Sequence, residues 1–455
     1  MSLISDSWGR ARIAIIGAGV SGVAAAVELC HSAPGKFEVT LFESRREAGG
    51  RTRSYVDAET GDILDNGQHL MMGCYTATLE HLRRIGSQDL VTISESLRIP
   101  FTDTGNGKTA YLESSKFLPA PLHLLRGLLR TNLLTPSEKY AAIQLGTRIK
   151  LDALPSDVDN LNCGEFLTRM HQPDGLGRKL WEPVILATIN AKVRDASARL
   201  FVNVVRLALL DSKQGSALVF PTTGLSELLI DPGVALLERT QGQTVKFGTP
   251  VDAIEKDDSG EWVVRHKNES EHFDAVIIAT NTNGIVMPEG IATTGFAPSP
   301  IVNAYFWIDK PILDSPIRAF LGTTLQWAFS KQTHLGGERL ALTVSAAQDI
   351  VERSNAELTD LLWSDLLAAI PGARQAKLLR SQIIREKRAT PLFTPATHQQ
   401  RPTTTTAYHN LYLAGDLVQN GLPATIEGAV RNGQQAARRV ILDGSADERS
   451  SLYSV

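Results

Sequence analysis

The sequence predicts an α/β fold with a parallel sheet, because a strand, a loop with glycine and a helix follow one another near both ends of the chain. Near the N-terminus, the apolar run 13–16 has the composition of a buried parallel strand and leads directly into the GAGVSG sequence of residues 17–22. A helix of small residues is expected over 20–30, and a second apolar strand over 37–42 ends on Glu43. This order of elements indicates a Rossmann-like site for an adenine dinucleotide.

The three glycines of residues 17–22 have different expected roles. Gly17 allows the tight turn, Gly19 lets a pyrophosphate approach the backbone, and Gly22 lets helix and strand pack closely. The diphosphate would lie at the helix N-terminus, where free N–H groups and the helix dipole favour negative charge. Glu43 is placed to accept hydrogen bonds from ribose hydroxyls. The residues predicted to bind the cofactor here are Gly17, Gly19, Val20, Ser21, Gly22, Glu43 and Ser44.

A second glycine pair follows the second strand, in the sequence Gly49-Gly50-Arg51-Thr52. Paired glycines let the backbone pass close to a ligand, and Arg51 can neutralise a diphosphate with a fixed fork of donors. The stretch resembles the GG-R-x-x-S/T signature of the FAD superfamily that contains amine oxidases and phytoene desaturases. The resemblance implies that these four residues bind FAD.

The C-terminal part of the chain carries a second unit of this kind. Residues 411–416 are expected to form a strand that ends on Gly415 and Asp416, and a helix is expected to begin after Pro423. In the superfamily that this sequence resembles, the Gly-Asp pair contacts the ribityl-phosphate part of FAD. The resemblance implies that the helix start, at Thr425 and Ile426, points at the flavin, because reduction leaves negative charge there that a helix N-terminus stabilises.

The middle of the chain is expected to return to the same domain. Strand signals over 243–254 and 261–266 flank a turn at 258–260, and a buried strand is expected over 273–280. The resemblance implies that Val251 lies near the adenine and Ala279 near the diphosphate. Two flavin motifs at opposite ends of one chain imply a domain built from distant segments.

We therefore predict a discontinuous FAD-binding domain made of residues 1–74, 212–284 and 385–455. Segments 75–211 and 285–384 are predicted to form an interleaved α+β substrate-binding domain. The first of these two segments is expected to be mostly helical, and the second to be rich in strands.

Composition excludes several classes of function. A net charge of −3 and a pI near 6.4 do not indicate the excess of basic residues that is typical of nucleic-acid-binding proteins. The three cysteines, Cys30, Cys74 and Cys163, are widely spaced, so neither a disulfide framework nor a metal site is expected, and a reducing cytoplasm fits them best. The sequence has no apolar run of about eighteen residues that could span a membrane.

Residues 116–134 are rich in leucine, and their charged side chains are Lys116, Arg126 and Arg130. Two interpretations stay open. The segment can lie in the interface of a bilayer, with its leucines inserted and its basic groups near lipid phosphates. Alternatively, it forms a helix pair that covers a substrate cavity. The first would make the protein peripheral on the inner face of the cytoplasmic membrane.

Further motifs resemble one subfamily, the squalene-associated FAD-dependent desaturases, over essentially the whole chain. They are LDNGQHL at 64–70, PAPLHLL at 119–125, WEP at 181–183, Asn190 and ASARLF at 196–201. The resemblance implies FADH2-dependent reduction of hydroxysqualene to squalene in hopanoid and isoprenoid biosynthesis. Its lipid substrate would be the main small-molecule partner. The electron donor stays open, because no second GxGxxG sequence indicates a site for NAD(P)H.

The implied reaction needs an acid, because an allylic hydroxyl leaves as water once it is protonated, and a hydride from reduced flavin then reaches the resulting cation. Asp65 and His69 lie on the loop that resembles the flavin-facing segment of the family and are the candidate catalytic acids. Desaturation or isomerisation of a carotenoid-like polyene is the alternative. Amine oxidation is disfavoured, because many amine oxidases have a tyrosine where this chain has Thr425.

Overall fold

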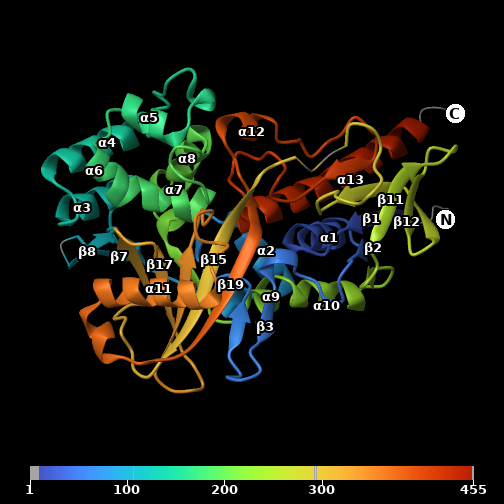
Figure 1. The fold of residues 1–455 in the computed structure, drawn as a ribbon. Helices are drawn as coiled ribbons and strands as arrows, with labels where there is room; N and C mark the ends of the chain where they lie inside the picture. The colour runs from blue at the N-terminus through green and yellow to red at the C-terminus, as the bar shows by residue number, and fades with distance from the viewer. Residues whose placement is uncertain (1–9, 106, 292, 294, 453–455) are drawn as a thin grey trace.

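Two sheets of different kinds organise the molecule. The computed structural model describes residues 10–105, 107–291, 293 and 295–452. Figure 1 shows the parallel sheet and the long helix α13 at one end, and a seven-stranded sheet with a group of helices at the other. Residues 1–9 and 453–455, at the ends of the predicted FAD-binding domain, lie outside the described residues.

The parallel sheet has the strand order β10-β2-β1-β14-β20, and each neighbouring pair is parallel. The apolar runs predicted as buried strands near both ends of the chain are confirmed, because each supplies a strand of this sheet. Distant segments therefore meet here, as the paired motifs implied. The strands are β1 (Ala11–Ile16), β2 (Phe37–Phe42), β10 (Thr244–Lys246), β14 (Ala275–Ile278) and β20 (Leu411–Leu413).

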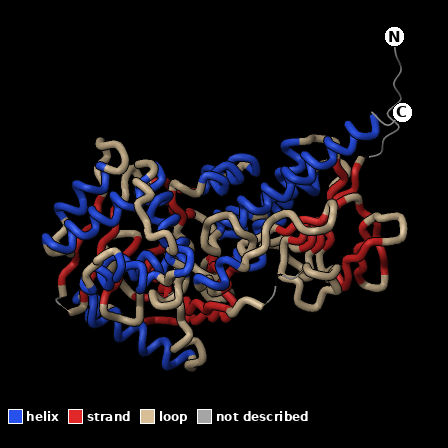
Figure 2. The backbone as a smooth tube through the Cα atoms, turned by 90° about the horizontal axis from the view of Figure 1, so that it is seen from above, coloured by secondary structure: helices blue, strands red, loops and turns tan. Residues whose placement is uncertain are grey.

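Alternate side chains of β1 enter two different cores, as the two-residue period of a strand requires. Ile13 and Ile15 pack with helices α1 and α13, whereas Ala14 and Ile16 pack with the antiparallel sheet β11-β12-β13 on the other face. Seen from above, helices run along one side of the strands at this end (Figure 2). These covering elements are α1 (Val20–Ser32), α13 (Ile426–Leu452), β11 (Val251–Lys256), β12 (Trp262–His266) and β13 (Glu269–Phe273).

The second large sheet has the order β19-β15-β18-β17-β16-β7-β8 and is antiparallel except for the parallel pair β16–β7. Helix α11 (Asn355–Ala369) packs against one face through an apolar core. The strands are β19 (Leu378–Pro391), β15 (Pro298–Ile308), β18 (Glu338–Val344), β17 (Trp327–Lys331), β16 (Ile317–Leu321), β7 (Arg98–Asp103) and β8 (Lys108–Glu113).

Two expectations about the division of the chain need correction. Segment 75–211 begins with more strand than predicted, because β7 pairs with β16, more than two hundred residues away, and β8 pairs with β7 at the edge of the seven-stranded sheet. The predicted boundary at residue 385 falls inside β19, which continues to Pro391 along β15. In both cases, pairing with a distant strand decides the local structure, and a local pattern cannot show that pairing.

The helical group beside this sheet has its own apolar core, which includes Phe166, Trp181 and Phe201. Within the described part of the chain, every helix is too short or too polar to cross a bilayer. The helices are α3 (Leu122–Arg130), α4 (Pro136–Lys150), α5 (Cys163–Arg169), α6 (Asp174–Leu176), α7 (Glu182–Ile189) and α8 (Ala198–Val205).

Short elements connect the two ends of the molecule. Helix α2 (Thr76–Ile85) packs against α1 and α13, although residue 76 lies in the segment predicted to bind substrate. The others are β3 (Ser54–Val56), β4 (Ile63–Asp65), β5 (Met71–Met72), β6 (Val91–Ile93), β9 (Leu218–Pro221), α9 (Leu225–Leu229), α10 (Asp231–Arg239) and α12 (Pro395–Gln399).

Candidate active site

The glycines at the N-terminus of α1 have the geometry that their expected roles require. Gly17 has φ +103°, and its N–H donates to the Phe42 carbonyl at 2.8 Å, which closes the turn. A Cβ atom on Gly22 would lie 1.9 Å from the Gly17 carbonyl oxygen, so only glycine fits there. A Cβ on Gly19 would meet open space, which leaves room for a ligand to approach this backbone.

The start of α1 fits a diphosphate group. Gly19 precedes the first turn and provides no side-chain cap for its N–H groups. Ser21 is 4% exposed, and its hydroxyl has no hydrogen-bond partner among the described residues. Gly19, Val20 and Ser21 all line the same cavity. Buried donors without protein partners are the groups that a bound anion would satisfy.

Glu43 is held by the loops around it. Its carboxylate accepts hydrogen bonds from the backbone N–H groups of Ala18 (3.0 Å) and Arg45 (2.9 Å) and from the Ser44 hydroxyl (3.2 Å). Glu43 is buried and is not among the cavity-lining residues. Its predicted contact with ribose therefore stays a prediction. The same holds for Val251, which packs in the core of β11 to β13.

The structure joins the two flavin motifs by an ion pair. Arg51 donates to both carboxylate oxygens of Asp416 at 2.7 Å and to the Ala389 carbonyl at 2.8 Å. Burial alone would raise the pKa of Asp416, but the charge and hydrogen bonds of Arg51, together with the Arg401 charge, outweigh burial and hold this pKa below its usual value. Arg51 and Asp416 were each predicted to contact the cofactor, and both line the cavity. Their bidentate contact with each other was not predicted.

Arg401 is a residue that the sequence analysis missed. Its guanidinium is buried, lies 4.2 Å from the Phe393 ring centroid, and donates to the carbonyls of Asp416, Leu417, Val418 and Leu422 at 2.6–3.1 Å. Burial lowers its pKa to about 10. Carbonyl groups of the loop after Gly415 thus surround the Arg401 guanidinium. A single arginine in a polar stretch carries no signal that could have indicated this role.

The remaining predicted residues of the cofactor site lie together around the same cavity. Thr425 Oγ1 accepts the Gly428 N–H at 3.1 Å and thereby caps the start of α13. Thr52 Oγ1 donates to the Gly49 carbonyl at 2.7 Å, which holds the glycine pair. Those that line the cavity are Gly49, Gly50, Arg51, Thr52, Ala279, Gly415, Asp416, Thr425 and Ile426.

The cavity has a volume of about 1020 Å³ and extends from these residues to the seven-stranded sheet. Its far wall is apolar and comes from the two sheets and the helical group. The wall includes Leu97, Ile99, Phe101, Leu112, Leu180, Pro183, Val184, Val204, Leu209, Ile317, Trp327 and Phe329. Of these residues, only Pro183 lies in a motif quoted from the sequence, because the wall comes from strands and helices that meet only in the folded chain.

His69 lines the cavity, but it differs from the expected acid. Its Nδ1–H donates to the Gly67 carbonyl at 2.8 Å. Burial lowers the pKa of His69, and the nearby Arg51 charge acts in the same direction. The imidazole is therefore mostly neutral at neutral pH, with its lone pair on Nε2. Burial disfavours the charged form of His69, so the predicted role of this side chain as a proton donor stays a prediction.

Asp65 has structural contacts in this fold, and its predicted role as a catalytic acid stays a prediction. Its Oδ1 accepts hydrogen bonds from the Leu225 N–H at 2.8 Å and the Ser54 hydroxyl at 2.6 Å. The carboxylate is buried and is not among the groups that line the cavity. It ties strand β4 to the start of α9, and both of these contacts are invisible to a local motif.

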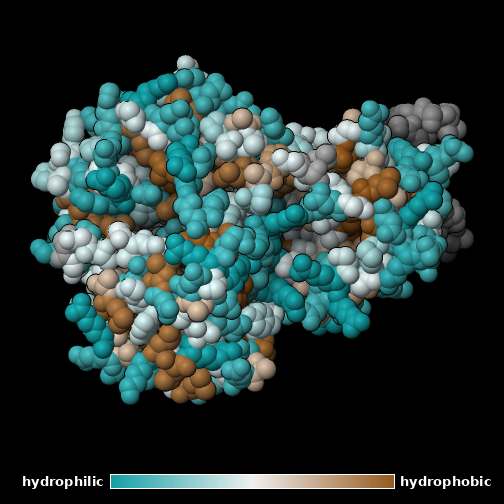
Figure 3. All heavy atoms as spheres, viewed as in Figure 1, coloured by the Kyte–Doolittle hydropathy of each residue, from teal (hydrophilic) through white to brown (hydrophobic). Residues whose placement is uncertain are grey.

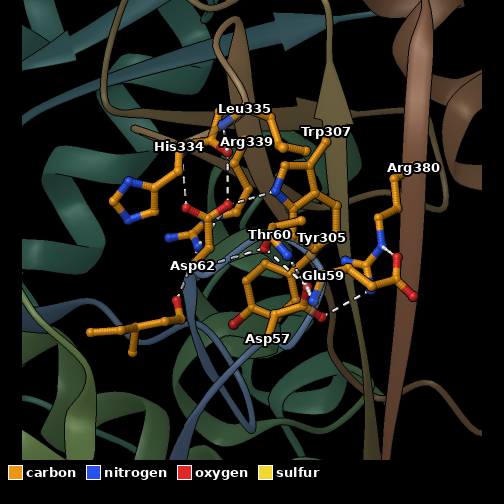
Figure 4. Close-up of polar contacts among 12 residues, drawn as sticks. Asp57, Glu59, Thr60, Asp62, Tyr305, Trp307, His334, Leu335, Arg339 and Arg380 are labelled. Atoms are coloured by element: carbon orange, nitrogen blue, oxygen red, sulfur yellow. Dashed lines mark hydrogen bonds and ion pairs between the residues drawn. The ribbon is translucent and has the colours of Figure 1, made fainter.

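The hairpin β3–β4, which leads into the loop of His69, is fixed to the large sheet (Figure 4). Asp62 accepts hydrogen bonds from Trp307 Nε1 and Thr333 Oγ1, both at 2.7 Å. Asp57 forms an ion pair with Arg380 at 2.9 Å. Burial would raise the pKa of Asp62, but these hydrogen bonds and the Arg339 charge outweigh burial and lower it. The anchored hairpin sets where the following loop meets the cavity.

The leucine-rich segment 116–134 has two distinct sides around α3. Leu124 and Leu128 pack against apolar cores, and His123 is fully buried. The outer side exposes Phe117 (87%), Leu118 (39%), Leu122 (48%) and Leu129 (54%). Elsewhere, hydrophobic residues occur in separate groups among hydrophilic ones on the face shown in Figure 3.

Comparison with known proteins places the chain in a family. The model of flavin-containing amine oxidoreductases matches residues 20–441. The chain is 32% identical over 448 residues to hydroxysqualene dehydroxylase of Rhodopseudomonas palustris, covering 95% of this chain and 99% of that protein. It is 30% identical over 431 residues to hydroxysqualene dehydroxylase of Sinorhizobium fredii, covering 93% and 96%.

A solved structure of a redesigned triple mutant of putrescine oxidase shares the fold, with a TM-score of 0.73 and 16% identity over 95% of this chain and 99% of that one. This likeness agrees with a cavity between a dinucleotide-type parallel sheet and a second sheet. The chain belongs to the flavin-containing amine oxidoreductase family and is an enzyme of that family.

Proposed function

We propose that this enzyme binds FAD without a covalent bond and reduces hydroxysqualene to squalene. The observation that carries the proposal is one cavity that joins a cradle for a dinucleotide to a long apolar wall. The curated relatives of 30–32% identity named above support the choice of substrate. An isoprenoid chain is almost entirely apolar, so such a wall would favour its binding by removing it from water.

The cofactor would be held from both ends of the chain. The free N–H groups of the first turn of α1 and the Ser21 hydroxyl would bind the diphosphate, and Arg51 would balance its charge from the other side. Gly415 and Asp416, held by Arg401, would bind the ribityl part. When bound in its reduced form, FAD would supply the hydride that replaces the hydroxyl group of the substrate.

The chain's own residues would then have three tasks. The apolar wall would hold the isoprenoid chain and keep bulk water away from the carbon that becomes positively charged. The loop from Gly67 to His69 would bring a proton to the substrate oxygen, which leaves as water. A protonated His69 would give up its proton more readily than an ordinary imidazolium, because burial lowers its pKa.

Peripheral contact with a membrane belongs to this proposal. Hydroxysqualene and squalene are nearly insoluble in water, so a route from a bilayer avoids a costly transfer through solvent. The surface formed by Phe117, Leu118, Leu122 and Leu129 would insert to headgroup depth. Arg126 and Arg130, exposed on the same helix, would meet anionic lipids.

The direct test is an anaerobic incubation of the photoreduced, FAD-loaded protein with hydroxysqualene, followed by analysis of the extracted lipids. We expect squalene to form, and acid precipitation of the protein to release FAD into the supernatant. A flavin that stays with the precipitate contradicts noncovalent binding. Failure to form squalene, together with activity on a carotenoid-like polyene, would establish the alternative desaturase function instead.

A further inference from the structure

Three side chains with polar groups lie side by side where the seven-stranded sheet forms a wall of the cavity. In the seven-stranded sheet, Asn303 of β15 is directly opposite Thr343 of β18, and Thr343 is opposite Trp327 of β17. Residues that are directly opposite in neighbouring strands lie on the same face of a sheet. All three line the cavity, so this face of the sheet is the cavity wall.

The same cross-strand row is apolar on both sides of this group. Ile384 lies opposite Asn303 on the outer side, and Ala319 followed by Phe101 continues the row beyond Trp327. A buried polar group that has no partner costs roughly 1–3 kcal/mol. Polar groups in the middle of an apolar wall are therefore expected to meet a polar atom of the ligand.

The contacts of Asn303 orient its amide group. Asn303 is 3% exposed, and its Oδ1 accepts a hydrogen bond from Thr343 Oγ1 at 3.0 Å. The acceptor atom of the amide is thus used inside the sheet, which leaves Nδ2 as a donor. Trp327 adds a second buried donor, because its Nε1 has no hydrogen-bond partner within the described residues.

The amide of Asn303 is also adjacent to the loop that carries His69. A Cβ atom on Gly67 would lie 2.9 Å from Asn303 Nδ2, so the donor lies against this loop. The carbonyl of Gly67 holds His69 through Nδ1 at 2.8 Å. A donor for an oxygen atom and a group able to carry a proton therefore meet at one place in the cavity.

We infer that Asn303 Nδ2 binds the hydroxyl oxygen of the substrate, and that Thr343 is the positioning residue that orients the amide. This inference rests on the proposed function and adds a basis for its specificity. The donated hydrogen bond holds the oxygen while a proton is transferred to it. The C–O bond then breaks, and both of its electrons leave with the oxygen as water. The reduced cofactor, when bound, would supply the hydride that forms the new C–H bond at this carbon.

The same site would select against hydrocarbons. A polyene without oxygen would fill the apolar wall but offer no acceptor to Asn303 Nδ2 or to Trp327 Nε1, and the latter has no hydrogen-bond partner within the described residues. Sites built to hydrogen-bond a hydroxyl discriminate against analogues that lack it for this reason. We therefore expect the oxidised, FAD-loaded protein to bind hydroxysqualene about tenfold more tightly than squalene, which is the difference made by about 1.4 kcal/mol.

The test compares equilibrium binding of the two lipids, measured from the change in flavin absorbance in the oxidised protein, where no turnover occurs. In Asn303→Leu, we expect the tenfold preference to disappear because only hydroxysqualene binding weakens. Asn303→Asp keeps the shape and can still accept from Thr343 but loses the donor, so it should lose the preference too. Thermal unfolding and FAD content show whether each variant is folded.

Thr343 provides a matched pair of variants. Thr343→Val removes the hydroxyl that orients the amide and should lower the preference several-fold, whereas Thr343→Ser keeps the hydroxyl and should retain it. If Asn303→Leu does not fold, Asn303→Asp and this pair decide the question. Undiminished preference in Asn303→Asp and Thr343→Val overturns the inference while leaving the function intact. Wild-type protein that neither binds nor reduces hydroxysqualene overturns the proposed function itself.

Discussion

The two ends of the cavity are built in different ways. At the dinucleotide end, the candidate ligands are mainly backbone N–H groups of Gly19, Val20 and Ser21 at the start of α1. At the sheet end, they are side chains such as Asn303 and Thr343, which come from strands far apart in the chain. Under the proposed function, backbone groups would bind the part of the cofactor that does not react, whereas side chains face the part of the cavity where the substrate is expected.

This difference shows where variation can be tolerated. A glycine-rich turn offers the same N–H groups whatever the neighbouring side chains are, so the dinucleotide end is set by steric limits on a few glycines. The sheet end can be changed one side chain at a time without altering the backbone. We therefore expect substitutions at the first end to affect folding and cofactor binding, and substitutions at the second to affect the choice of substrate.

The largest effect should come from Gly22→Ala. The new Cβ would lie 1.9 Å from the Gly17 carbonyl oxygen, so β1 and α1 must move apart, at a cost of about 3 kcal/mol or more. Gly19→Ala is the matched control, because its Cβ meets open space. Thermal unfolding should show a large loss of stability for the first variant and little for the second. Equal losses in both would contradict the steric argument.

Acid should destabilise both halves of the molecule. Burial lowers the pKa of His81, on α2, and of His398, on α12, to about 4. Between pH 6.5 and 4 the unfolded chain binds protons that the folded chain does not, so this stability is present above pH 6.5 and lost as pH falls toward 4. For His81 the loss is on the order of 3 kcal/mol.

We would measure the free energy of unfolding by denaturant titration across this pH range. The proteins compared are the wild type, His81→Gln and His398→Gln. Each substitution should flatten the pH dependence of the unfolding free energy. If the two halves unfold as one unit, both variants will act on the same transition. Two separate transitions, each responding to one histidine, would show that the halves are independent.

Removing the ion pair that links the two flavin motifs should weaken the cofactor site. Asp416→Ala leaves Arg51 beside the cavity without its carboxylate partner, and we expect FAD binding to weaken by about 2 kcal/mol. Arg98→Ala, which breaks an exposed pair with Glu113, is the control. Titration of the apoprotein with FAD should distinguish them. Unchanged FAD affinity in Asp416→Ala would show that the pair only supports the fold.

The smallest effect should be at the surface of α3. Leu122→Asp combined with Leu129→Asp should reduce flotation with anionic liposomes, because both side chains are exposed. Leu379→Asp, at a leucine of similar exposure on β19, is the control. Leu124 and Leu128 are unsuitable for this test, because they pack inward. If all variants float like the wild type, or if the wild type does not float, α3 serves only to complete the apolar cores that its inner leucines contact.

The sequence by itself determined the parallel sheet and the cradle at its edge. The apolar runs of β1, β14 and β20 could be predicted because strands buried on both faces are continuously apolar, whereas β2 was predicted from its mainly apolar sequence between the helix and Glu43. The roles of Gly17, Gly19 and Gly22 could be predicted because each depends on local backbone geometry or close approach that favours glycine.

Only the tertiary structure decided the rest of the site. Asp65 had the residue type of an acid, but its contacts with Leu225 and Ser54 use its carboxylate elsewhere. His69 had the expected position, but burial changed its pKa. The row of Asn303, Thr343 and Trp327 exists only through strand pairing. Desolvation and side-chain contacts depend on which distant segments meet, and that information is not contained in any short stretch of sequence.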